Sequence, residues 1–197
     1  MSLKIHIEGG GDDRATQLRL RVAFAQFIAN ALPANNDRPS VSPGGGRNQT
    51  AAQFVRDRRL LPGVQHFLVV DSEGPPPADT WAGLGQGAQP ADALCFLMVQ
   101  TMEAWLVADA DALSAFYGQG FRAASLPQRP NLEEEPKVDL YAKLAAATAG
   151  AKRGPYAKAH GWELIGKVDP AKVRARCPAA ARFLDAVIAA LPARPRP

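Results

Sequence analysis

The sequence predicts an α/β fold with a mainly parallel β-sheet flanked by helices. Two observations point to it: β-rich runs alternate with segments of helical periodicity, and residues 93–100 are apolar nearly throughout, as in a strand covered on both faces. A third is the length of 197 residues, which is enough to bury a sizeable core. After residue 110 the pattern becomes mainly helical. We therefore expect an α/β core at 1–110 and a helical C-terminal extension at 111–197, packed on the same domain.

The first predicted unit is a strand, a glycine-rich loop and a helix. Residues 3–7 alternate apolar and polar side chains, and the glycines that follow end the strand, which leaves Glu8 at its carboxyl end. A helix is expected from 14 to 32, with arginines on it and with Asp12 or Asp13 as its N-cap, although both aspartates could instead be ligands. Its helical spacing rests on Leu18, Val22, Ala25, Ile28 and Leu32.

The second unit begins with a short extended piece around Val41. It leads into a glycine-rich turn at 42–47 and then a helix whose expected cap is Asn48. Backbone amides of such a turn could hold a phosphate at the start of the helix. The turn lacks the P-loop pattern, so an ATPase site is not expected in it.

The third unit is a β-rich run at 64–70 that ends at two carboxylates, Asp71 and Glu73. The Pro- and Gly-rich stretch 75–90 is expected to be a loop. The apolar strand at 93–100 follows, and a helix opens behind it at Glu103. Glu103 is either a first-turn carboxylate favoured by the helix dipole or a further member of a site.

The C-terminal part carries helical periodicity in three segments, 138–149, 156–168 and 180–191. We expect the last five residues to be frayed. Four aromatic residues sit among apolar neighbours at helical spacing, so we expect core positions rather than base-stacking surfaces. They are Trp105, Phe116, Tyr117 and Trp162.

The composition sets few limits on partners. A net charge of +4 and a pI near 9.3 permit a nucleic-acid partner without demanding one. Cys95 and Cys177 have no zinc-site spacing, so we expect two reduced thiols, with Cys95 buried. No run reaches the roughly 20 apolar residues of a membrane span, and the start does not resemble a signal peptide. These features predict a cytoplasmic protein with no membrane partner.

The acidic residues that could form a site lie at the carboxyl ends of the predicted strands. In an open parallel sheet, ligands bind outside the carboxyl ends of the strands. Four acidic residues are expected there: Glu8, Asp71, Glu73 and Glu103. Clustered carboxylates raise one another's pKa, and a divalent cation removes that repulsion. Oxygen-only ligands favour Mg²⁺ or Mn²⁺ over zinc.

These segments resemble a known family. KIHIEGGGDD together with HFLVVDSEG is similar to the Toprim domain of topoisomerases, primases and OLD-family nucleases, in which a glutamate follows the first strand and an acidic pair follows a later one. Glu8 matches the glutamate, and Asp71 and Glu73 match the pair. MVQTMEAWLVAD, FRAASLPQRPNLEEEPK and KRGPYAKAHGWELIGKVDP extend the resemblance to a bacterial Toprim-like family of unknown function. The resemblance implies a Toprim-like, Rossmann-like fold.

The resemblance also implies an activity: a Mg²⁺- or Mn²⁺-dependent nuclease or phosphotransfer enzyme acting on DNA or RNA, in phage defence or another toxin-like role. Asp71 and Glu73 would be metal ligands, and Glu8 a ligand or the general base. Glu103 would support them or bind a second metal, and His160 would donate a proton to the leaving oxygen. OLD-type enzymes use an ATPase, which here would be a separate partner.

A phosphodiester also needs cationic contacts. The basic residues expected to face the site are Arg47, Lys152, Arg153 and Lys158. The last three could equally form a solvated helical face, and His160 is more often a hydrogen-bonded structural histidine. His6 and His66 lie inside strands, where we expect structural roles.

Two other functions stay open at this point. The pocket could belong to a non-catalytic Toprim-like module that binds a nucleotide, a phosphorylated ligand or a partner protein. Nucleotidyl transfer of the primase kind would use the same carboxylates but needs an NTP pocket, which the sequence does not identify.

Overall fold

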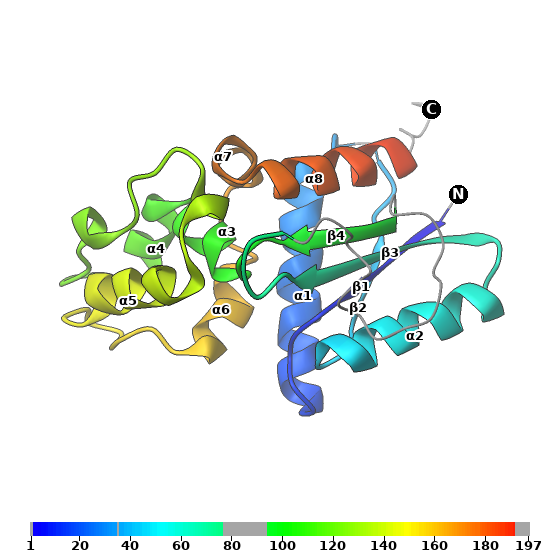
Figure 1. Ribbon diagram of the computed structural model, residues 1–197, viewed down its shortest axis with the longest axis horizontal. Helices are drawn as coiled ribbons and strands as arrows, with labels where there is room; N and C mark the ends of the chain where they lie inside the picture. The colour runs from blue at the N-terminus through cyan, green and yellow to red at the C-terminus, as the bar shows by residue number, and fades with distance from the viewer. Residues whose placement is uncertain (1, 35, 77–93, 192–197) are drawn as a thin grey trace.

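The computed structural model describes residues 2–34, 36–76 and 94–191. Its centre is a four-stranded sheet in the order β2-β1-β3-β4, with every neighbouring pair parallel (Figure 1). The fold is therefore Rossmann-like α/β, which confirms the predicted class. The strands are β1 (Ser2–Ile7), β2 (Ser40–Pro43), β3 (Val64–Asp71) and β4 (Cys95–Met98).

Helices connect and cover these strands. In Figure 1, α3 to α6 gather beyond the carboxyl end of the strands, while α8 returns to lie beside the sheet. The helices are α1 (Arg14–Ala31), α2 (Arg47–Leu60), α3 (Glu103–Val107), α4 (Ala110–Tyr117), α5 (Lys137–Thr148), α6 (Lys158–Leu164), α7 (Pro170–Arg176) and α8 (Pro178–Ala190), with 3₁₀ turns at Ala123–Ser125 and Leu132–Glu134.

Both faces of the sheet are covered. Successive side chains of a strand point to opposite faces, and in β3 this separates two cores. Phe67 and Val69 join the larger core with α1 and α8. Leu68 and Val70 join a smaller core with Phe54 of α2. Covered faces explain why β3 is apolar without strict alternation.

The C-terminal helix completes the larger core. Trp105 of α3 is fully buried, with ring centroids 6.1 Å from Phe24 of α1 and 6.0 Å from Phe183 of α8. Phe183 also packs against Phe96 of β4 at 5.4 Å. The C-terminal part therefore packs on the N-terminal sheet, and Trp105 has the core role expected of it.

Helix α1 forms where the sequence predicts it, but a different face is buried. Asp13 is its N-cap, and its carboxylate accepts the Thr16 N–H at 2.8 Å. Leu18 and Val22, which suggested the helical spacing, are 56% and 62% exposed. Aromatic side chains bury more apolar area than Leu or Val, so the register with two phenylalanines faces the sheet. The buried residues are Leu20, Phe24, Phe27 and Ile28.

The predicted cap of α2 is wrong. The helix begins at Arg47, one residue before Asn48, and its N-cap is Gly46. The Gly46 N–H donates to the side chain of Gln49 at 3.1 Å, and its carbonyl accepts from Thr50. Gln49 thus makes one half of a capping box, in which the side chain at the third helical position accepts the N–H of the N-cap residue.

The remaining predictions concern the two cysteines, membrane spans and two segments of the chain. Cys95 and Cys177 are both buried. None of the helices within the described ranges is both long enough and apolar enough to cross a membrane. Most of the predicted loop at 75–90, and the predicted frayed end, lie outside the described residues.

The strand order creates a switch point. The chain leaves β1, runs through α1 on one face to β2, and then crosses by α2 on the other face to β3 on the far side of β1. Neighbouring strands whose connections leave in opposite directions open a crevice at their carboxyl ends, where α/β proteins bind ligands. The segments that follow β1 and β3 begin with Glu8 and Ser72.

Candidate functional site

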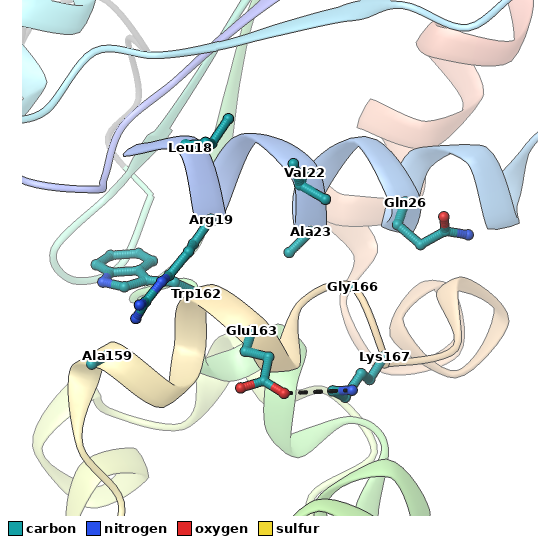
Figure 2. A pocket seen from close by; sticks show the side chains of 10 residues that line it. All are labelled: Leu18, Arg19, Val22, Ala23, Gln26, Ala159, Trp162, Glu163, Gly166 and Lys167. Atoms are coloured by element: carbon teal, nitrogen blue, oxygen red, sulfur yellow. Dashed lines mark ion pairs between the residues drawn. The ribbon is translucent and has the colours of Figure 1, made fainter. Parts of the chain in front are cut away.

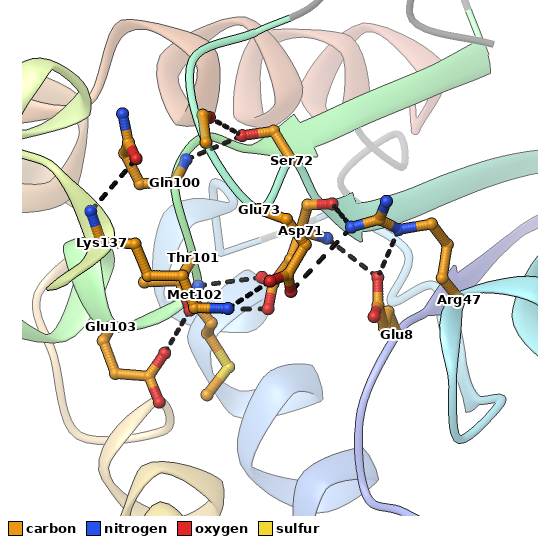
Figure 3. Close-up of polar contacts among 11 residues, drawn as sticks. Glu8, Arg47, Asp71, Ser72, Glu73, Gln100, Thr101, Met102, Glu103 and Lys137 are labelled. Carbon is orange, nitrogen blue, oxygen red and sulfur yellow. Dashed lines mark hydrogen bonds and ion pairs between the residues drawn. The ribbon is translucent and has the colours of Figure 1, made fainter. Parts of the chain in front are cut away.

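Glu8 and Asp71 meet across this switch point. Glu8 follows β1, and Asp71 is the last residue of β3. A carboxylate oxygen of Glu8 accepts the Asp71 backbone N–H at 3.1 Å (Figure 3). The Glu8 N–H in turn donates to the Val69 carbonyl at 2.9 Å. The two strands thus fix the two acidic residues side by side.

Asp71 is a buried carboxylate at the centre of the site. Its Oδ1 accepts the Met102 N–H at 2.9 Å, and the side chain is close to the Thr101 hydroxyl. Burial, and then the charges of Glu8 and Glu103, raise the pKa of Asp71 to about 7. Burial also raises the pKa of Glu8, even though Arg47 opposes it. A site that disfavours its own negative charge gains when a cation binds.

Glu103 lies in the first turn of α3, where its charge acts on Asp71. It is the first residue of α3, and it is almost fully buried. The Thr101 hydroxyl donates to one of its oxygens, and the Tyr156 hydroxyl donates to the other at 2.6 Å. Burial and the Glu103 charge raise the pKa of Tyr156 well above its usual value. The tyrosine therefore stays a donor and holds Glu103 in place.

Glu73 is held in a different way. Its backbone has φ 62°, a conformation that residues other than glycine rarely adopt. Its exposed carboxylate pairs with Lys137 of α5 and lies 3.9 Å from Arg47. Unusual backbone geometry beside a crevice is common at functional sites.

Arg47 reaches the site from the glycine-rich turn, as predicted. It donates to the Asp71 carbonyl at 2.6 Å, and its Nε lies 3.5 Å from Glu8 (Figure 3). Arg47 thus links the ends of β1, β2 and β3. In this arrangement its charge is shared with carboxylates, so a phosphate would have to compete for it.

Two glycine loops form the floor of the site. The Gly9 and Gly45 backbones hydrogen-bond to each other at 2.7 and 3.1 Å, and both have positive φ, 131° and 78°. A Cβ on Gly9 would lie 2.9 Å from Leu20 and 3.1 Å from Trp162. The close approach of these loops therefore depends on glycine.

These features enclose a pocket of about 290 Å³, which we call the acidic pocket. The two glycine loops of its floor follow β1 and β2. Lys158 and Trp162 of α6 also line it, with Trp162 next to Gly9. All four predicted carboxylates line it: Glu8, Asp71, Glu73 and Glu103.

Arg47 does not line the acidic pocket but pairs with two of its carboxylates. Three other predicted residues neither line it nor, within the described residues, form an ion pair with its carboxylates. Lys152 and Arg153 are exposed outside its lining, and Arg153 pairs with Glu163 at 3.1 Å. His160 also lies outside the lining, with Nδ1 3.0 Å from the Tyr117 hydroxyl. Burial lowers the pKa of His160. The geometry favours a structural role for this histidine over proton donation in the pocket.

The comparison with protein families covers nearly all of this architecture. A model described as a domain of unknown function, DUF4276, matches residues 7–188. The chain belongs to the DUF4276 family. No curated protein and no solved structure matches it. The matched region includes both the sheet and the helical part, so the residues of α6 that line the acidic pocket belong to the same family domain.

The sequence did not predict the positions of Lys137 and Tyr156 at the site of this DUF4276 chain, and it predicted only a core position for Trp162. Lys137 holds Glu73, and Tyr156 holds Glu103. Trp162 packs against the core but is only partly buried, and it also lines the acidic pocket. All three come from the helical part, more than 50 residues from the carboxylates they approach. No local pattern signals such contacts.

The donor set suits a hard divalent cation but is not assembled as a cage. Within the described residues, no three Asp, Glu, His or Cys side chains are grouped closely enough to hold a metal. The reason is visible in Figure 3: Glu8 turns to Arg47, and Glu73 turns to Lys137. Glu8, Asp71 and Glu73 are the residues that could converge on Mg²⁺ or Mn²⁺ once these contacts are exchanged.

Proposed function

We propose that this DUF4276 protein is a Mg²⁺- or Mn²⁺-dependent nuclease or phosphotransfer enzyme with a Toprim-like site. The observation that carries the proposal is the contact of Glu8 with buried Asp71 at the switch point of the sheet. This contact places the two acidic residues side by side, and burial raises the pKa of both carboxyl groups, which a bound cation would counteract.

The chain's own residues would divide the work as follows. Asp71 and Glu73 are the metal ligands, and Glu8 is a third ligand or the general base, for which a raised pKa is useful. Bound Mg²⁺ or Mn²⁺ would supply Lewis acidity for a phosphate and lower the pKa of water. Glu103, fixed by Tyr156, adds negative charge behind Asp71.

The cations around the acidic pocket would orient the phosphate. Lys158 lines the pocket, and Arg47 borders it through Glu8 and Glu73. A phosphate that enters can take over the hydrogen bonds that Arg47 now gives to protein groups. The release of Glu8 and Glu73 from Arg47 would then coincide with substrate binding.

One observation favours the non-catalytic alternative. Each site carboxylate already has a partner in the structure, and the pocket is bordered by Arg47, Lys137 and Lys158. A phosphorylated ligand could bind to these cations without any metal. Binding of inorganic phosphate or a nucleotide that survives Asp71→Asn in EDTA would support this module.

Cleavage assays separate the two functions. Wild-type protein, Asp71→Asn and a control, Asp185→Asn, are incubated with single- and double-stranded DNA and RNA in Mn²⁺, Mg²⁺ or EDTA. Asp185 is an exposed aspartate of α8 paired with Arg174. Asp185→Asn therefore makes the same chemical change outside the site. The proposal expects cleavage by wild type and the control, none by Asp71→Asn and none in EDTA. Equal results for wild type and Asp71→Asn would remove its basis.

The same reactions, with an NTP and a primed template, test nucleotidyl transfer. Template-dependent incorporation would identify the primase-like alternative. Phage defence and a separate ATPase partner remain proposals that follow from the resemblance alone.

A further inference from the structure

Helix α1 presents an exposed cationic surface beside the acidic pocket. Arg14, Arg19 and Arg21 are all exposed, and the helix contains no aspartate or glutamate. The two most exposed apolar residues of the helix, Leu18 and Val22, lie between them. Leu18 and Val22 are four residues apart on the helix, so their side chains are neighbours and form a small apolar patch beside the arginines.

A groove of about 550 Å³ lies between α1 and α6 (Figure 2). Its apolar wall includes Leu18, Val22 and the ring of Trp162. Figure 2 shows the Arg19 side chain extending toward Trp162, and Lys167 lies along the α6 side. The groove thus combines an aromatic side chain with Arg19, while Lys167 is paired with Glu163, which also lines the groove.

The groove shares one lining residue with each of two neighbouring hollows. Trp162 lines both the groove and the acidic pocket. Leu18 lines both the groove and a pocket of about 390 Å³ that also contains Arg14 and Arg21. Leu18 and Trp162 lie at the same end of the groove (Figure 2), so an acidic, an aromatic and a basic hollow adjoin one another there.

We propose that these three hollows form a track for a single-stranded nucleic acid. This inference rests on the proposed function and specifies its substrate class. The reacting phosphate lies in the acidic pocket, a flanking base packs against Trp162 in the groove, and phosphates further along contact Arg14 and Arg21. Stacking on an aromatic ring together with a basic path is how proteins hold single strands without reading their sequence.

The chemistry of the track favours a single strand over a duplex. A base can lie against Trp162 only if it has left its own stack, which single strands permit at little cost. The exposed arginines match the regular negative charge of a phosphate backbone. Lys158, 6.0 Å from the Trp162 ring centre, adds a cation where the groove meets the acidic pocket.

The test is binding of labelled 12-nucleotide DNA and RNA, single-stranded and as duplexes, by fluorescence anisotropy in EDTA. The track predicts tighter binding of single strands, and a Kd at least about fivefold weaker for Trp162→Ala, because stacking on one aromatic residue contributes that much or more. Trp162→Phe keeps an aromatic ring and should retain most of the affinity. A DNA or RNA preference would identify the sugar that the track accepts.

Charge is tested with a matched pair of variants. Arg21→Gln should weaken binding and make the salt dependence of log K shallower by about one unit. Arg59→Gln, an exposed arginine on α2 across the sheet, should change neither. Equal binding by wild type, Trp162→Ala and Arg21→Gln, or tighter binding of duplexes, would overturn the track.

These outcomes are separable from the proposed activity because no metal is present in the binding assay. Binding that depends on Trp162, without cleavage in Mn²⁺, would keep the track and reject the nuclease. Metal-dependent cleavage that is indifferent to Trp162 and Arg21 would keep the nuclease and reject the track.

Discussion

The carboxylate of Glu8 accepts the backbone N–H of Asp71, which joins the ends of β1 and β3 and places the two acidic residues side by side. Burial, followed by the charges of Glu8 and Glu103, raises the pKa of Asp71, so the charged form of Asp71 is unfavourable in the folded protein.

Replacing Asp71 with Asn should stabilise the protein at high pH. The folded-state pKa of Asp71 is about 7, above its ordinary 3.8. The free energy of unfolding therefore falls as the pH rises from 3.8 through 7, because the folded protein holds the proton of Asp71 longer than the unfolded chain does. Asn keeps an acceptor for the Met102 N–H without the charge. We expect Asp71→Asn to raise the free energy of unfolding by about 2 kcal/mol at pH 8 and much less at pH 4.

Urea denaturation at the two pH values measures this difference, with Asp185→Asn as the exposed control. A variant that is less stable than wild type at pH 8 would show that the Asp71 charge is already well compensated.

His6 should produce the opposite pH dependence. It is buried against His66, with Nε2 and Nδ1 3.1 Å apart, and burial, followed by the Lys4 charge, lowers its pKa to about 4. The unfolded chain therefore binds more protons between pH 6.5 and 4, and stability falls as pH falls through that range. The loss is at most about 3 kcal/mol.

His6→Gln should lose this slope, whatever its stability at pH 7. Comparing the unfolding free energy of variant and wild type at pH 7, 5.5 and 4.5 isolates the contribution of His6. An unchanged difference across these pH values would mean that His6 does not titrate as described.

Lys137→Ala should release Glu73 for a metal. Lys137 pairs with the exposed Glu73 carboxylate, so a divalent cation must now displace it. We expect a several-fold lower Kd for Mn²⁺ by calorimetry, and a stability change below about 1 kcal/mol, since the pair is partly exposed. Lys167→Ala, which removes an exposed pair with Glu163, is the control. Weaker Mn²⁺ binding in Lys137→Ala alone would indicate that Lys137 positions Glu73 for the metal.

Gly9→Ala should destabilise the floor of the site. A Cβ there meets Leu20 at 2.9 Å and Trp162 at 3.1 Å, and φ is 131°. We expect a loss of about 2 kcal/mol. Gly63→Ala is a matched control because a Cβ at Gly63 meets nothing within 4 Å. Thermal melts of both variants decide the matter, and equal melting temperatures would contradict the described packing.

Local patterns predicted the parts of the fold that depend on neighbouring residues. The ends of β1 before Glu8 and of β3 at Asp71 are predictable because apolar runs stop there at glycine and acidic residues. Parallel strands then place such ends at the same edge of the sheet. The Asp13 cap of α1 is equally local.

What the sequence did not predict depends on tertiary contacts. Burial of Phe24 and Phe27 exposes Leu18, and the N-cap of α2 is Gly46, whose N–H bonds to Gln49, rather than Asn48. Trp162 reaches the acidic pocket because α6 packs on α1, far away in the sequence. Helical periodicity shows that a residue has apolar neighbours but does not show which surface it faces.

Mn²⁺ binding by wild type, Asp71→Asn and Asp185→Asn at pH 8, followed by calorimetry, tests the central claim most directly. We expect wild type and Asp185→Asn to bind Mn²⁺ with similar affinity, and Asp71→Asn to bind it at least about tenfold more weakly. Absence of Mn²⁺ binding by wild type, or equal binding by all three proteins, would contradict a metal site built on Glu8, Asp71 and Glu73.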